Sequence, residues 1–287
     1  MQPHRSLIAL SALAAVVVLA GCGSGGGTAT GPIVQPAHVY ALSGFKPAGP
    51  VLPGRRTDVS FTIRQPSGKP LTEYKECCEP HEGVDLIVVR SDDSHIQYLD
   101  ADADADGEVS EDVVFPTPGR YRITIDAYPK VSGPTMPFNF QLFKWVTVRG
   151  SYRPKPLPRF RSTQTVDGYH FRIEGRPHLK AIDPTFLVIH VTDPAGHKVV
   201  FTNWRGALAH AIFFHEGSLA YSHTHVCKPG AIYCFSALGN IRVTGHSTAP
   251  GILKIGVLLP ESGTWRLFIL TYLHGHVVTV PFTLHVR

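Results

Sequence analysis

The feature that most constrains the fold is a set of turn and strand landmarks that occurs twice in the same order. Each landmark of the first half returns 125 to 144 residues later; the pairs are Pro66–Gly68 with Pro194–Gly196, Ile87–Val89 with Ile212–Phe214, Pro116–Arg122 with Pro260–Arg266, and Phe138–Val148 with Val278–Val286. Such ordered self-similarity indicates a tandem duplication. The offset rises within the second copy because that copy carries an insert near residues 226–249.

The composition indicates what each copy folds into. The 24 prolines and 27 glycines punctuate short segments rich in Val, Thr, Phe and Tyr, which favours strands with frequent turns. About seven short strands in each copy are typical of an immunoglobulin-like sandwich. We therefore predict an all-β chain with two immunoglobulin-like β-sandwich domains in tandem. They occupy residues 39–149 and 163–287, and residues 150–162, rich in Pro and Arg, form a linker.

The N-terminus carries a targeting signal. After a short basic start, Leu7–Ala20 is an apolar run too short to span a bilayer comfortably. The segment Leu19–Cys22 resembles the lipobox of bacterial lipoprotein signal peptides. The resemblance implies cleavage before Cys22, a diacylglyceryl thioether on its sulfur and an acylated amine. The prediction is a signal peptide over residues 1–21 and a flexible Gly-rich tether over 22–38; the alternative is an ordinary cleaved signal or a short membrane anchor.

Lipid attachment and the charge pattern together limit the partners. We expect a protein anchored to the cell membrane on its extracytoplasmic face, with membrane lipid as one partner through Cys22 and another envelope protein as a second. The formal charge is only +5 and the basic residues are scattered, so no nucleic acid is expected. No nucleophile elbow, phosphate loop or zinc-protease motif occurs. We therefore predict no enzyme activity and identify no small-molecule substrate.

Three histidines are predicted to converge at one end of a β-hairpin. Ala211–Phe214 is a short apolar run, Ala220–Thr224 is its return, and Gly217-Ser218 is a two-residue hairpin signal. With that loop, His210 lies opposite His225, and Ile212 lies opposite His223. Directly opposed residues share a face, and so do residues two positions apart on one strand. The three imidazoles therefore face one side of the sheet.

Three imidazoles on one face are a typical first shell for a transition metal. Imidazole-rich sites suit Cu(II), Zn(II) or Ni(II). His274, preferred over His276 in the last predicted turn, is the candidate fourth ligand. The competing interpretation is that His210, His223 and His225 are hydrogen-bonded structural residues.

The repeat provides an internal comparison for this hairpin. Shifting by 125 residues places Asp85, Tyr98 and Asp100 of the first copy where the second copy has its histidines. The first copy keeps the hairpin and lacks the imidazoles, which favours specialisation of the second copy. Asp85 and Asp100 would face each other, which is unfavourable without a cation or a shared proton.

The cysteines outside the signal suggest disulfides. Cys227 and Cys234 bracket six residues of the insert, and a bond between them would hold the insert beside His225. Cys77 and Cys78 are adjacent. They form a vicinal disulfide or two buried thiols, or else a redox-labile pair or a soft-metal site with His81. Four cysteines allow three pairings, and the sequence does not choose between them.

An acidic run after the first copy's hairpin resembles a calcium loop. Asp102, Asp104 and Asp106, followed by Gly107, fit the first positions of the EF-hand pattern. The twelfth position is Val113 rather than Glu, and no helices flank the run. An acidic turn at a strand end is the favoured interpretation, and calcium binding is the alternative.

Three motifs carry a resemblance to a known family: Gly206–His210, Glu216–His225 and Ser262–Phe268. With these motifs the chain looks like bacterial exported proteins that have duplicated Ig-like modules similar to the YtkA-like domain and are described as copper- or heavy-metal-binding. The family shows His at the end of the first hairpin strand, His-x-His at the end of the second and His near the last turn. The resemblance therefore implies copper as the metal, with zinc as the alternative, and the ligands His210, His223, His225 and His274. The first copy departs from the pattern.

These observations lead to one main hypothesis and one alternative. The main hypothesis is a lipid-anchored lipoprotein whose C-terminal domain binds copper or zinc for buffering or delivery. The alternative is a non-catalytic Ig-like adhesion or scaffold module of the cell envelope, with structural histidines.

Overall fold

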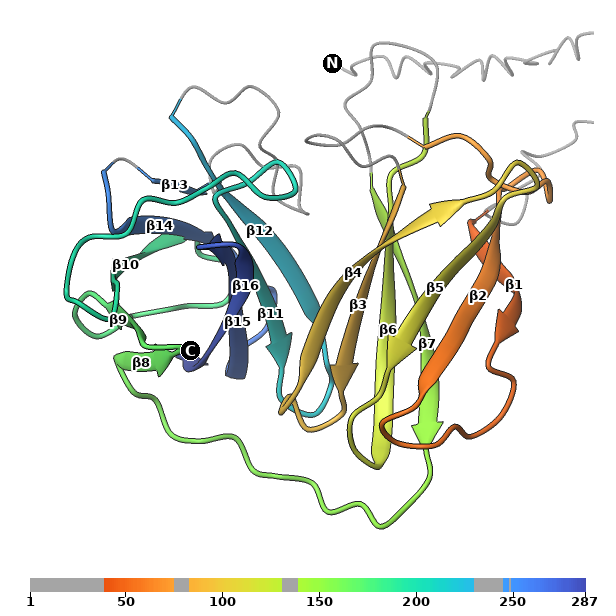
Figure 1. Ribbon diagram of the computed structural model, residues 1–287, viewed down its shortest axis with the longest axis horizontal. Coiled ribbons are helices and arrows are strands. Elements are labelled where there is room, and N and C mark those ends of the chain that lie inside the picture. The colour runs from red at the N-terminus through yellow and green to blue at the C-terminus, as the bar shows by residue number, and fades with distance from the viewer. Residues whose placement is uncertain (1–38, 75–82, 131–138, 230–244, 248) are drawn as a thin grey trace, which may run out of the picture. The chain divides into compact units, whose positions relative to one another are not determined.

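The computed structural model describes residues 39–74, 83–130, 139–229, 245–247 and 249–287, and every regular element in these ranges is a β-strand. Residues His38–Arg287 form one compact unit. Within this unit the strands belong to two sheets, one of seven strands and one of nine (Figure 1). The predicted all-β class, with two sandwiches in tandem, is confirmed.

The first sandwich is a seven-stranded sheet folded over on itself, in the order β1-β2-β5-β4-β3-β6-β7. Strand β4 connects the two layers of this folded sheet, because Ile96–Ala101 pair with β3 whereas Asp102 and Ala103 pair with β5. Apolar side chains from the two layers, among them Phe61 and Ile123, meet in one core. The strands are β1 (Ala41–Lys46), β2 (Arg56–Arg64), β3 (Val84–Arg90), β4 (Ile96–Ala103), β5 (Glu108–Val114), β6 (Gly119–Ala127) and β7 (Phe140–Val148).

The second sandwich is a nine-stranded sheet in the order β16-β15-β11-β12-β13-β14-β10-β9-β8. Short β13 joins the layers, since it pairs with β12 on one side and β14 on the other. Phe171, Ile189, Phe213 and Trp265 belong to its core. The strands are β8 (Thr163–Val166), β9 (Tyr169–Ile173), β10 (Thr185–Thr192), β11 (Ala209–His215), β12 (Tyr221–Cys227), β13 (Gly245–His246), β14 (Ile252–Val257), β15 (Gly263–Leu273) and β16 (His276–Val286).

A shared corner shows that the two sandwiches are built alike. The Tyr121 hydroxyl at the start of β6 donates to the Thr117 carbonyl at 3.0 Å, the tyrosine corner of immunoglobulin-like folds. At the start of β15 the Trp265 indole N–H donates to the Glu261 carbonyl, also at 3.0 Å. Both partners are shifted by the same 144 residues, so the repeat seen in the sequence is also a repeat in hydrogen bonding.

The outer faces of the two sandwiches are covered where β3 and β4 meet β11 and β12 (Figure 1). On β11, Ala211 and Phe213 point into the core of the second sandwich, whereas Ile212 and Phe214 point outward. The outward residues are nevertheless fully buried, because they pack against the first sandwich. The apolar contact consists of Ile87, Val89, Ile96, Tyr98, Ile212, Phe214, Leu219, Phe268 and Leu270.

Candidate metal centre

The β11–β12 hairpin has the register expected from the sequence. His210 pairs with His225, and Ile212 pairs with His223. The loop differs from the two-residue expectation, because the His215 amide donates to the Ala220 carbonyl at 3.0 Å and four residues lie between them. Gly217 and Leu219 take left-handed conformations there, with φ of 86° and 54°. The wider loop has the same centre as the expected one, so the register is unchanged.

The three histidines of this hairpin gather in one buried cluster. One ring nitrogen from each of His210, His223 and His225 can be chosen so that all three atoms lie within 4.8 Å of one another. The ring centroids of His225 lie 4.7 Å from those of both His210 and His223. The side chains are 1%, 1% and 6% exposed in chain order, so the cluster is shielded from solvent.

Hydrogen bonds orient His210 within the cluster. Its Nε2 lies 3.2 Å from the backbone carbonyl of Trp204, which only accepts, so Nε2 carries the proton. Nδ1 of His210 is then a lone pair, and Nε2 of His223 lies 3.1 Å from it. A metal-ligating histidine is commonly held in this way, with the opposite ring N–H on a carbonyl. His210 is therefore arranged to offer Nδ1 as a ligand.

The electrostatics keep these rings neutral. Burial lowers the pKa of His210 and His223 well below the usual 6.5, and the nearby charge of His225 lowers both further. Imidazole binds a metal in its unprotonated form. At neutral pH both rings are thus in the form that a metal requires.

The first sandwich covers the cluster with an aromatic side chain and two polar contacts. The Tyr98 ring lies edge-on to His210 and His223, with centroids 5.1 and 5.6 Å away. An ion pair of 2.7 Å joins Arg205 Nη1 of the second sandwich to Asp100 Oδ1 of the first. The Tyr221 hydroxyl donates to Asp126 Oδ2 at 3.3 Å. This cover makes the site an inter-sandwich feature, which the hairpin pattern alone did not predict.

Two carboxylates on this face of the first sandwich, Asp126 and Asp85, have raised pKa values. Burial raises the pKa of Asp126 to about 6, opposed by hydrogen bonds from Asn139, Gln141 and Tyr221. Burial also raises the pKa of Asp85 well above its ordinary value, and the charge of Asp126 adds to the rise. In both residues burial disfavours the charged carboxylate.

The expected fourth ligand, His274, is not part of the cluster. His210 lies opposite Leu270 on β15, and β15 continues past that level before the turn at His274. Four residues of strand span about 13 Å. His274 is in a left-handed conformation with φ of 47°, and its ring stacks on Tyr169 at 6.0 Å. This placement corrects the prediction and leaves three histidines.

The acidic run is a capped turn rather than a cation site. Asp104 Oδ1 accepts hydrogen bonds from the backbone amides of Asp106 at 2.9 Å and Glu108 at 2.8 Å. Asp102 and Asp104 line a surface pocket together with Asp58 and Glu108. Even so, Asp102, Asp104 and Asp106 are not among the described groups whose ligand atoms lie close enough to hold one ion. Across the described part of the chain, the metal-capable group of three or more His, Cys, Asp or Glu side chains is the histidine cluster. The calcium alternative is therefore not supported.

The cysteine and lipid predictions fall mostly outside the described residues. Cys227, at the end of β12, is disulfide-bonded and buried. Its predicted partner Cys234 lies outside the described residues, as do Cys77, Cys78 and the lipidation residue Cys22. The pairing and the lipid attachment therefore stay predictions.

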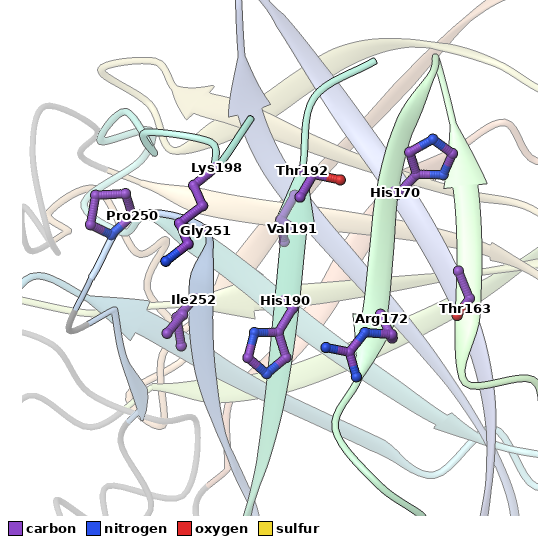
Figure 2. Close-up of a pocket in the computed structure, with 10 residues that line it drawn as sticks. All are labelled: Thr163, His170, Arg172, His190, Val191, Thr192, Lys198, Pro250, Gly251 and Ile252. Carbon is purple, nitrogen blue, oxygen red and sulfur yellow. The ribbon is translucent and has the colours of Figure 1, made fainter. Parts of the chain in front are cut away.

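A separate pocket lies on the β8–β9–β10–β14 side of the second sandwich (Figure 2). Its volume is about 410 Å³. His190 and Arg172 extend side by side there, and His190 Nε2 is paired with Glu174 Oε2 at 2.8 Å. The pocket lining includes none of the three clustered histidines. The residues lining it are Thr163, His170, Arg172, His190, Val191, Thr192, Lys198, Pro250, Gly251 and Ile252.

Comparison with known protein families gives one match, in the second half of the chain. Residues 164–287, less than half of the chain, match a family described as "Domain of unknown function (DUF8832)". No curated protein matches the chain. No helix among the described residues has the length and apolar character needed to cross a membrane.

Solved structures with some likeness to the chain include an adhesion protein, invasin and an S-layer protein. A tetra-tandem repeat from the extending region of a large adhesion protein is 10% identical, with a TM-score of 0.25, and the match covers 86% of this chain and 48% of that one. Invasin, a bacterial integrin-binding protein, is 12% identical with a TM-score of 0.24, and the match covers 86% of this chain and 38% of that one. Domains 4 and 5 of the S-layer protein SbsC are 9% identical with a TM-score of 0.22, and the match covers 86% of this chain and 97% of that one. The chain thus spans half or less of the first two structures, and TM-scores this low carry no argument about function.

Proposed function

We propose that this protein binds a transition-metal ion, copper or zinc, through His210, His223 and His225. We further propose, from the lipobox at Leu19–Cys22, that it does so as a membrane-anchored lipoprotein outside the cytoplasm, where it buffers or delivers the metal. The observation that carries the metal proposal is the convergence of three imidazole nitrogens within 4.8 Å. Zinc and copper are commonly held by imidazole nitrogens about 2.0–2.1 Å away, so three such donors suit one ion.

The surroundings of the cluster support this proposal. Burial keeps His210 and His223 in the neutral form that binds metals. The Trp204 carbonyl fixes the ring orientation of His210 through Nε2. A bound ion would replace the hydrogen bond between His210 Nδ1 and His223 Nε2, so the second ring would have to move its proton to Nδ1. Metal binding should therefore change the tautomer of His223.

A second candidate function is supported by a different observation. His210 and His223 satisfy each other through their hydrogen bond, and Tyr98 and Trp204 pack edge-on against His210. A cluster satisfied without metal fits a scaffold or adhesion module in which the histidines only join the two sandwiches. The two candidates differ in one respect, which is saturable metal binding.

Calorimetric titration of the full chain with Zn(II) and Cu(II) separates the two candidates. We expect one saturable site, lost in the double variant His210→Ala plus His225→Ala, because at most one imidazole of the cluster would remain. His274→Ala is the matched control and should bind as tightly as the wild type, since His274 lies outside the cluster. Absence of saturable binding in the wild type, or unchanged binding in the double variant, would leave the scaffold function.

A further inference from the structure

Each sandwich has a row of paired residues at the same level of its outer face. In the second sandwich His225 pairs with His210, which pairs with Leu270 of β15. In the first sandwich the corresponding row is acidic, because Asp100 pairs with Asp85 and Asp85 pairs with Asp126. Opposed and adjacent residues on neighbouring strands share a face, so the three carboxylates form one band.

The acidic band reaches the histidine cluster through contacts between the sandwiches. Asp126 is fully buried and accepts a hydrogen bond from Tyr221, two residues before His223. Asp85 is hydrogen-bonded to Tyr98, whose ring lies against His210 and His223. Asp126 also interacts electrostatically with His225. The carboxylates therefore form an outer layer that is separated from the histidines by one tyrosine each, Tyr221 for Asp126 and Tyr98 for Asp85.

Carboxylates in this outer layer can balance the charge of a bound metal ion. Three neutral imidazoles leave the full charge on a bound ion, so a Zn(II) or Cu(II) centre keeps two positive charges. A buried charge is costly unless an opposite charge is nearby. A monovalent ion such as Cu(I) needs half as much compensation. Buried carboxylates should therefore favour a divalent ion over a monovalent one.

We propose, building on the metal function above, that Asp126 and Asp85 of the first sandwich supply the counter-charge for the ion held by the second. The metal centre is then complete only when both sandwiches contribute. The carboxylates act as positioning and charge-balancing residues, not as ligands, and they set the preference for a divalent ion.

The test compares Zn(II) and Cu(I) affinities of the full chain, measured by competition with chromophoric chelators. We expect Asp126→Asn to weaken Zn(II) binding by about 10-fold, the lower end of the range for groups hydrogen-bonded to a metal ligand, because Asp126 is bonded to Tyr221 rather than to a ligand. Cu(I) binding should weaken by a smaller factor. Asp112→Asn is the matched control, because Asp112 is half-exposed and pairs with Arg56 on another strand. Its affinities should equal those of the wild type.

Several outcomes separate this inference from the proposed function. Zn(II) affinity within twofold of the wild type in Asp126→Asn, or equal losses for Zn(II) and Cu(I), would overturn the counter-charge role while leaving the histidine site intact. Absence of Zn(II) binding by the wild type would instead overturn the proposed function. Near-UV circular dichroism checks folding. If Asp126→Asn does not fold, the less buried Asp85→Asn decides by the same criteria.

Discussion

The outer faces of the two sandwiches share a backbone and differ in chemistry. Positions 85 and 100 of the first sandwich pair as positions 210 and 225 do in the second, yet the first pair is two aspartates and the second is two histidines. The corner bonds at Tyr121 and Trp265 show that the frame around them is the same. The duplicated fold therefore fixes where the side chains lie, whereas the side chains decide what the site can bind.

The two faces also cover each other, and this contact buries the histidines. Ile87 and Val89 of β3 belong to the same apolar cluster as Ile212 and Phe214 of β11. Without the first sandwich, the histidine face of the second would be a solvent-exposed sheet surface. Its burial, and the low pKa of His210 that follows from burial, depend on that contact.

Truncating equivalent positions of this contact should produce the largest effect. Phe214→Ala is expected to lower the free energy of unfolding by about 3–5 kcal/mol. Val89→Ala, its counterpart in the first sandwich, should cost about 2 kcal/mol because it removes fewer buried carbons. Urea denaturation followed by circular dichroism measures both. Val200→Ala is the control, since Val200 is 76% exposed and should matter little. Costs below about 1 kcal/mol at both contact positions would contradict the docking of the faces.

In metal-free protein, the histidines of the second sandwich and Asp126 of the first should change the folding stability in opposite directions as the pH changes. The lowered pKa values of His210 and His223 mean that the folded state binds fewer protons, so their stability contribution is present above pH 6.5 and lost as the pH falls. The pKa of Asp126 rises from 3.8 to about 6, so its contribution is present below 3.8 and lost as the pH rises through 6.

Asp126→Asn separates these two responses. From pH 4 to pH 8, the unfolding free energy of the variant relative to wild type should rise by about 3 kcal/mol, because the variant lacks the cost of ionising a buried acid. Chemical denaturation in the presence of a chelator measures this difference. A relative stability that is flat with pH for Asp126→Asn would mean that the carboxylate is not desolvated.

The shared corner should give the smallest effect. Tyr121→Phe removes the hydroxyl that donates to Thr117 and keeps the ring, so the expected loss is about 0.5–1.5 kcal/mol. Differential scanning calorimetry measures the change. A Tyr121→Phe protein as stable as the wild type would show that the corner bond, although repeated as Trp265 to Glu261, contributes nothing in the first sandwich.

The sequence was sufficient for the local parts of this structure. The all-β class and the pairing of His210 with His225 follow from turn residues and from the two-residue period of strands, which are short-range signals. The apolar runs Val84–Arg90 and Ala209–His215 also held unused information. Each contains four consecutive apolar residues, which is typical of strands covered on both faces.

The remaining features depend on long-range packing that single-strand patterns do not encode. The placement of His274 depended on how far β15 extends beyond Leu270. The role of Asp126 required knowing which face of the first sandwich meets the second. The acidic run resembled a calcium loop because backbone capping by Asp104 uses the same residue types as cation binding.

The most direct test of the central claim is zinc K-edge X-ray absorption of the full chain loaded with one equivalent of Zn(II). We predict about three nitrogen donors at about 2.0–2.1 Å, with the multiple scattering that imidazole rings give. The His210→Ala plus His225→Ala variant should lack that imidazole scattering. A first shell of sulfur at about 2.3 Å, or of oxygen without imidazole scattering, would place the metal elsewhere and contradict the account.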